Sequence, residues 1–90
     1  MALLDVAVVS AEKEVWSGQA SRVVARTTEG EIGILSGHEP LMGLVAGGEV
    51  RILTEEGKTV RAQAEGGFLS VANDRVSVVA DAAEITQILD

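Results

Sequence analysis

The chain has 90 residues, a net charge of −7 and no cysteine. A chain of this length forms one domain and buries about 60–65% of the surface that it exposes when unfolded. The lack of cysteine excludes disulfides, thiolate nucleophiles and zinc ribbons, and the negative charge disfavours nucleic acid and anionic lipid as partners.

The N-terminal sequence MALLDVAVV lacks a basic region and carries an aspartate within its apolar run, so we expect no signal peptide. No apolar run approaches the ~20 residues that cross a bilayer. Any contact with a membrane is therefore expected to come through a partner protein.

Apolar and polar residues alternate along most of the chain, which predicts strands, because side chains on a strand point alternately to its two faces. In chain order, the alternating runs are residues 4–8, 22–26, 32–34, 50–52, 60–64, 69–71 and 76–78. Turn residues separate them: 55–58 and 72–75 are predicted hairpin tips, and the Gly-Gly pairs at 47–48 and 66–67 are predicted reversals. Many short strands at this spacing favour an all-β sandwich or flattened barrel.

The last ten residues, DAAEITQILD, break this alternation. Asp81 and Glu84 resemble a helix capping box, and Ile85, Ile88 and Leu89 are spaced as on one face of a helix. We therefore expect a β-sandwich domain over residues 1–82 and the start of a linker or short helix over residues 83–90.

The segment TEGEIGILSGHEPLM, residues 28–42, holds the only histidine and the only proline. Ser36 and Glu39 flank His38, as nucleophilic catalysis would require of a hydroxyl, a base and an orienting acid. Neighbours in a tight turn rarely align their side chains, however, and no G-x-S-x-G elbow is present. We therefore expect no catalytic residue.

Metal and phosphate sites are not expected either. One histidine beside Glu29, Glu31 and Glu39 has no recognised ligand spacing. On a strand, Glu29 and Glu31 would point to one face, roughly 6.5–7 Å apart at the backbone, and two solvated carboxylates explain them best. No phosphate-binding loop G-x-x-x-x-G-K-[ST] occurs. We expect no metal, nucleotide or other cofactor.

Lys58 supports a different hypothesis, because it sits in EEGKTV at a predicted hairpin tip. Small acidic all-β carrier domains present a lysine for lipoyl or biotinyl attachment at such a tip. A solvated turn lysine is the simpler interpretation, and a carrier domain that uses Lys58 is kept as the alternative function.

Three segments stand out by their order and spacing: DVAVVSAEKEVWSG (5–18), TEGEIGILSGHEPLM (28–42) and EGGFLSVANDRVSVVADAAE (65–84). Together they resemble the N-terminal domain of the epsilon subunit of bacterial F-type ATP synthases, the counterpart of the mitochondrial delta subunit. The resemblance covers essentially the whole chain. Ser36 departs from it, because the family often has proline there.

The resemblance implies a ten-stranded β-sandwich in the rotating central stalk, beside the gamma subunit and on the membrane-embedded c-ring. Its role would be mechanical: the subunit passes torque between proton flow and ATP synthesis and is not an enzyme. The expected location is the cytoplasmic face of the bacterial cell membrane, with membrane contact only through the complex and no homo-oligomer required.

Residue roles follow from the resemblance by position alone. Glu29, Gly30 and Glu31 match the loop that faces the c-ring. The positions on or near the gamma-facing surface are matched by Ser10, His38, Leu41 and Met42. Apolar side chains on a surface loop suit a protein interface, although Leu41 and Met42 could instead plug the end of the sandwich.

Full-length relatives continue into a C-terminal helical hairpin, which inhibits ATP hydrolysis and in some relatives binds ATP. Residues 88–90, ILD, stand where the nucleotide-binding pattern [IL]-D-x-x-R-A would open. The hairpin is absent from this sequence, so inhibition and nucleotide sensing are not expected of these residues. Either a cut chain or a naturally short subunit explains this end.

Overall fold

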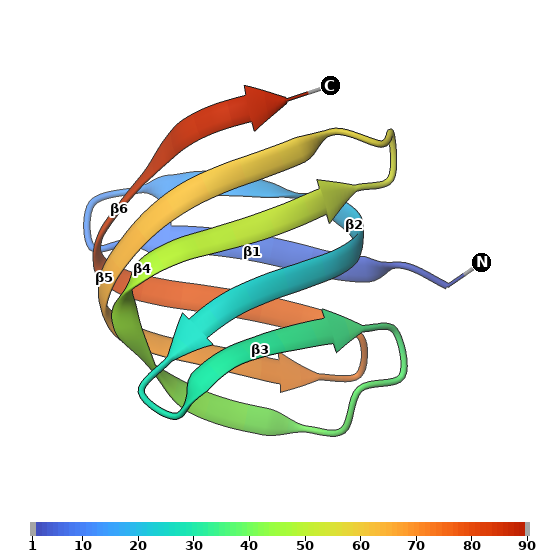
Figure 1. Ribbon diagram of the computed structural model, residues 1–90, viewed down its shortest axis with the longest axis horizontal. Coiled ribbons are helices and arrows are strands. Elements are labelled where there is room, and N and C mark those ends of the chain that lie inside the picture. Colours follow the sequence, from blue (N-terminus) through green and yellow to red (C-terminus); the bar gives the residue numbers. More distant parts are fainter. Residues whose placement is uncertain (1, 90) are drawn as a thin grey trace.

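The computed structural model describes residues 2–89 as an all-β molecule (Figure 1). Its six strands are β1 (Leu4–Ser10), β2 (Glu14–Thr27), β3 (Gly30–Leu35), β4 (Leu41–Thr54), β5 (Thr59–Ala72) and β6 (Arg75–Leu89). The described part of the chain has no helix that is long and apolar enough to cross a membrane.

The strands form one continuous sheet that closes on itself. Its order is β1-β6-β5-β4-β2-β3, and an additional pairing joins β1 to β2. Only β1 and β6 run parallel; the other pairings are antiparallel. Closure leaves few free sheet edges, which suits a small all-β domain because exposed edges invite aggregation.

The closed sheet is flattened into two layers, and each of the four longest strands runs from one layer into the other (Figure 1). What we call the β3 layer contains β3 with residues 20–27, 48–54, 59–65 and 82–89. What we call the β1 layer contains β1 with residues 14–20, 41–45, 67–72 and 75–80. Each layer therefore has five strand segments, built from six strands.

The all-β sandwich is thus confirmed, whereas the predicted count of ten strands is wrong for the described residues. The two glycine pairs predicted as reversals lie inside β4 and β5 instead. Gly47, Gly66 and Gly67 have positive φ values of 64°, 65° and 115°, which let a strand bend sharply without ending. Bending carries β4 and β5 from one layer into the other.

The helix expected at the C-terminus is also wrong. Residues 83–89 belong to β6 and pair with β5, so no linker separates them from the sandwich; residue 90 lies outside the described part. Ile85 pairs with Ala62 and Ile88 with Val60, and a β-bulge places one extra residue between them. The bulge turns the strand spacing of two into three, so Ile85 and Ile88 have a helical spacing in the sequence although they lie on a strand.

The core consists of aliphatic side chains from both layers. Fully buried are Leu4, Val8, Val23, Ile34, Val50, Ile52, Leu69, Val71, Val76 and Val78. These are the inward positions of the alternating runs, so the predicted strand faces are confirmed. Neither aromatic residue is buried in the core: Trp16 packs against its side, and Phe68 is 40% exposed.

Candidate functional site

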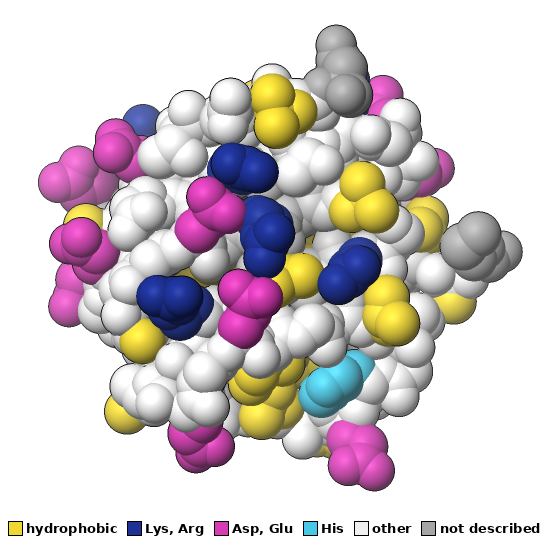
Figure 2. All heavy atoms as spheres, viewed as in Figure 1, with side chains coloured by type: hydrophobic (Ala, Val, Ile, Leu, Met, Phe, Trp, Pro, Cys, Tyr) yellow, Lys and Arg dark blue, Asp and Glu magenta, His cyan; other side chains and the backbone are white. Residues whose placement is uncertain are grey.

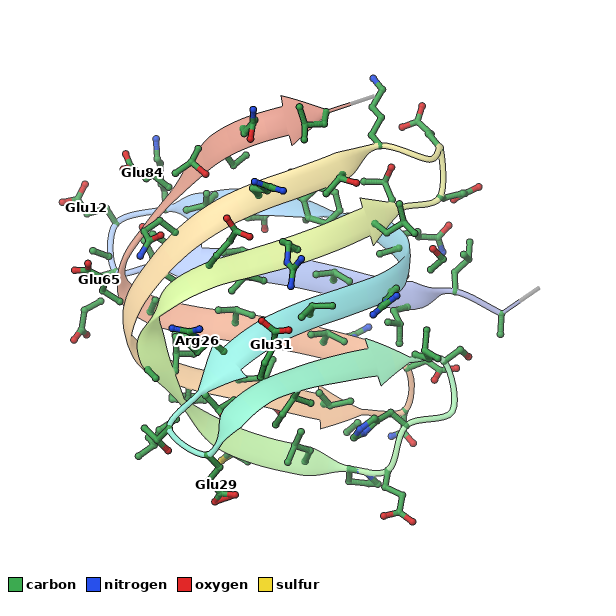
Figure 3. All side chains as sticks on the ribbon, in the orientation of Figure 1. Glu12, Arg26, Glu29, Glu31, Glu65 and Glu84 are labelled. Carbon is green, nitrogen blue, oxygen red and sulfur yellow. The ribbon has the colours of Figure 1, made fainter. Side chains whose placement is uncertain are left out.

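The β2–β3 turn carries Glu29 and Gly30, two of the residues predicted to face a c-ring. Thr27, only 4% exposed, closes this turn from within. Its hydroxyl donates to the Gly30 carbonyl at 2.9 Å and accepts from the Glu29 amide at 3.2 Å. Thr28 N–H also donates to the Leu44 carbonyl at 3.0 Å. The turn is therefore anchored to two strands, and Glu29 projects from it into solvent (Figure 3).

Glu31, the third of these residues, lies apart from Glu29. It is on β3 directly opposite Arg26 of β2, and its carboxylate forms an ion pair with Arg51 at 3.3 Å. Glu29 precedes the strand, so the two glutamates do not form the one-faced pair that their spacing suggested. Glu29 is the carboxylate at the tip of the turn, whereas Glu31 belongs to a charged sheet face.

The β3–β4 loop, residues 36–40, holds His38 in a backbone that hydrogen bonds tie to Asp74 and Leu35. Ser36 Oγ and the Gly37 amide both donate to the Asp74 carboxylate, at 3.0 and 2.7 Å. The His38 amide donates to the Leu35 carbonyl at 3.1 Å, and its ring Nδ1 lies 2.8 Å from the Glu39 carbonyl. This contact engages His38 with a backbone acceptor, not with a serine or a carboxylate.

Ser10 lies far from that loop. Its hydroxyl accepts from the Glu12 and Lys13 amides, both at 3.3 Å, and so closes the β1–β2 turn. The Asp74 carbonyl accepts the Asp5 amide near the start of β1. Ser10 and the His38 loop are therefore at opposite ends of a seven-residue strand, roughly 20 Å apart.

Leu41 and Met42 have different environments although they are adjacent on β4. Leu41 packs against the buried core, as the plugging alternative proposed. Met42 points outward and is 71% exposed. The alternation of a strand explains this division, since only one of two neighbours can face the core.

Met42, one of the residues predicted to face gamma, begins an exposed apolar surface whose other members were not predicted. Leu44 lies two residues further on the same face, Phe68 pairs with Leu44 across β4 and β5, and Val79 pairs with Phe68 across β5 and β6. Their exposed fractions are 62%, 40% and 37%. We call Met42, Leu44, Phe68 and Val79 the apolar row. The period-two spacing of Met42 and Leu44 was the only local signal for it.

The hollows on the described surface are open rather than cleft-like. One of about 350 Å³ lies where β1 meets β2 and β6 and is lined largely by small side chains. Within residues 2–89, no three histidine, aspartate or glutamate side chains gather as a metal site would require. Lys58 lies in the β4–β5 turn, where its amide donates to Thr54 Oγ1 at 3.0 Å.

Comparison with known proteins agrees with this geometry. Residues 3–86 match the family described as ATP synthase, Delta/Epsilon chain, beta-sandwich domain. The ATP synthase epsilon chain of Streptomyces coelicolor is 49% identical over 87 residues, 97% of this chain and 70% of the relative. That of Frankia casuarinae is 54% identical over 84 residues, 92% of this chain and 98% of the relative.

Solved structures show the same fold. A chain in the mitochondrial ATP synthase of Euglena gracilis, solved with OSCP, F1 and the c-ring, superposes with a TM-score of 0.87 at 25% identity. The match covers 94% of this chain, which spans only 54% of the Euglena chain. This family is not one of lipoyl or biotinyl carriers, so the alternative function for Lys58 has no support. The chain is a member of the ATP synthase delta/epsilon family, and residues 3–86 form its β-sandwich domain.

Proposed function

We propose that this chain is the epsilon subunit of a bacterial F-type ATP synthase, a non-catalytic rotor subunit of the central stalk. The observation that carries the proposal is the family match over residues 3–86, joined to about 50% identity with proteins named ATP synthase epsilon chain. The subunit binds gamma and the c-ring and couples proton translocation to ATP synthesis. It works at the cytoplasmic face of the cell membrane, which it meets only through the complex.

The fold suits a part that transmits force. Four strands of 14 or 15 residues run through both layers, so a load applied to one layer is carried to the other along continuous backbone. Hydrogen bonds join each of these strands to its neighbours around the closed sheet. Such a body moves as a unit, and no side-chain chemistry is required of it.

The surface proposed to face gamma is the outer side of the β1 layer. The apolar row crosses this side, and exposed apolar rows of this kind form the centre of protein interfaces. Ser10 ends β1 and the His38 loop lies near the other end of that strand, so the row occupies the distance between them. Leu41 supports Met42 from the core side instead of reaching the partner.

The β2–β3 turn is the part proposed to face the c-ring. Glu29 is exposed at its tip, and Gly30, with a φ of 117°, gives the tight turn that presents it. An exposed carboxylate suits polar or basic loops on a partner, where ion pairs set the docking register more than the affinity. The Euglena relative belongs to an assembly whose structure includes a c-ring, and this supports the assignment.

Co-isolation from membranes tests the proposal. A tagged copy of the chain, expressed in a host that carries the matching synthase, is expected to recover the gamma and c subunits from detergent-solubilised membranes. The same chain with Met42→Glu and Leu44→Glu is the matched control, since it places charge on two exposed members of the apolar row without changing the core. Recovery of no synthase subunit with the unaltered chain would overturn the proposal.

A further inference from the structure

Four of the chain's five arginines lie on one sheet face. They are Arg22 and Arg26 on β2, Arg51 on β4 and Arg61 on β5. The buried alternate residues of these strands turn all four outward, away from the core. Figure 2 shows basic side chains gathered over the middle of this β3-layer face, with acidic ones between them and more around the rim. We call the four arginines the basic face.

The middle of this face has the opposite sign to the molecule. The outward carboxylates of the whole face are Glu31, Glu49, Glu65 and Glu84, so four arginines meet four glutamates in a chain whose net charge is −7. Glu65 and Glu84 lie toward the edge of the sheet in Figure 3, which leaves Glu31 and Glu49 as the carboxylates beside the arginines in the middle. The remaining surface therefore carries all of the negative excess.

The carboxylates in the middle do not satisfy the arginines. Arg51 contacts Glu31 at 3.3 Å and Glu49 at 3.4 Å, and Arg61 reaches Glu49 at only 4.0 Å. Arg61 Nε is shielded from solvent and has no acceptor within residues 2–89. In the same part of the chain, Arg22 and Arg26 form no ion pair within 4.0 Å. Among the described residues, the middle of the face therefore has more guanidinium groups than carboxylates, and Arg22 and Arg26 have no ion-pair partner.

A hollow of about 200 Å³ lies between Arg22 and Arg51. Val24 and Leu53 supply apolar surface to it, and Thr59 lines it as well. Arg51 and its Glu31 partner stay 40% and 56% exposed, so a ligand can reach the guanidinium without unfolding the sheet. Two arginines beside an apolar hollow suit a carboxylate on a short aliphatic stem, because a guanidinium binds carboxylates through paired N–H groups.

We propose that the basic face docks an acidic segment of a partner protein and seats one of its glutamate or aspartate carboxylates between Arg22 and Arg51. Charge complementarity selects this occupant. Nucleic acid and anionic lipid are repelled at long range by the net charge of −7, whereas a short acidic segment meets only the local positive field. A second copy of the chain carries the same negative excess and is disfavoured for the same reason.

This surface is separate from the one proposed to face gamma. The basic face covers the outside of the β3 layer, whereas the apolar row covers the outside of the β1 layer. A chain bound to one partner through the apolar row therefore still presents its arginines. Loss of acidic-peptide binding and loss of gamma binding are separately measurable.

Nuclear magnetic resonance titration tests the proposal. The isotope-labelled chain is titrated with a synthetic peptide of about ten alternating glutamate and leucine residues, at salt of about 20 mM to limit screening. We expect saturable shifts of the arginine Nε–H signals of Arg22 and Arg51. The double variant Arg22→Gln, Arg26→Gln is expected to weaken binding at least fivefold, and Glu49→Gln to strengthen it.

Arg75→Gln is the matched control, because it removes the fifth arginine from the start of β6 in the β1 layer. It should change the affinity for the peptide less than twofold. Equal weakening by Arg75→Gln, the absence of saturable binding, or tighter binding of duplex DNA or anionic vesicles than of the peptide would each overturn the proposal. Self-association abolished by Arg22→Gln would overturn it as well.

Discussion

Ser36 Oγ donates a hydrogen bond to Asp74 Oδ2 at 3.0 Å, across a sequence separation of 38 residues. The other carboxylate oxygen accepts the Gly37 amide at 2.7 Å, and the Asp74 carbonyl accepts the Asp5 amide at 2.8 Å. Asp74 itself adopts a φ of 60°, a conformation that aspartate and asparagine tolerate better than most residues. One turn residue therefore ties the β3–β4 loop and the start of β1 to the β5–β6 hairpin.

Asp74→Asn keeps the turn conformation but replaces one acceptor oxygen with an amino group. It should lower the free energy of unfolding by about 1 kcal/mol, the typical effect of one hydrogen bond. Amide exchange at Gly37 should become faster, while exchange in the core strands stays slow. Asp81→Asn, the same chemical change at an exposed β6 position, is the control and should alter neither measurement.

Gly67→Ala should be the most destabilising substitution of a glycine in this chain. A Cβ at Gly67 would collide with the Val79 carbonyl oxygen, and its φ of 115° disfavours any side chain. Because the backbone has to shift, we expect the free energy of unfolding, measured by denaturant titration, to fall by about 3 kcal/mol or more. The control is Gly33→Ala, where nothing lies within 4 Å, and which should be neutral or mildly stabilising.

Much of this fold follows from the sequence because the core alternates at period two through every strand. The glycine pairs illustrate where local reasoning stops: a positive φ permits either a chain reversal or a bend within a strand. The choice is made by pairing with a distant strand, as between Gly67 and Ala80. The bulge between Ile85 and Ile88 is another such case, since residues on β5 determine it.

The candidate surfaces were predictable to different degrees. Glu29 and Met42 were placed by resemblance, and both are exposed as expected of contact residues. Phe68 and Val79 join Met42 only through strand register, which no short stretch of sequence encodes. The basic face is likewise assembled from β2, β4 and β5, so its arginines are scattered in the sequence and adjacent in the fold.

Met42→Glu with Leu44→Glu should weaken the complex with a purified gamma subunit by about tenfold or more, since central apolar contacts commonly contribute 1–2 kcal/mol or more each. Both side chains are exposed, so thermal unfolding should change little. Calorimetric titration measures the affinity. Leu53→Glu, at an exposed leucine of the β3 layer, is the matched control. If it weakened gamma binding as much as the double variant does, the apolar row would not be part of the interface.

Leu41→Ala should act differently from these two substitutions. Leu41 packs against the core, so its truncation leaves a partly filled space and should cost roughly 1–3 kcal/mol of unfolding free energy. The affinity for gamma, measured where the variant is fully folded, should change less than threefold. A large loss of affinity without a loss of stability would show that Leu41 itself reaches the partner.

Glu29→Lys should weaken binding of the gamma complex of this chain to isolated c-rings by about threefold or more at low salt. Glu29 is exposed at the tip of an anchored turn, so a reversed charge acts on the partner and not on the fold. Glu31→Gln should have a smaller effect, because Glu31 is engaged by Arg51. Glu56→Lys, in the exposed β4–β5 turn, repeats the charge reversal at another turn and controls for the change in net charge.

Rising salt should erase the difference in c-ring binding between Glu29→Lys and the unaltered chain. Salt screens interactions between exposed charges, with a screening length of about 10 Å at 0.1 M. If Glu56→Lys weakened c-ring binding as much as Glu29→Lys does, the c-ring contact would lie outside the β2–β3 turn.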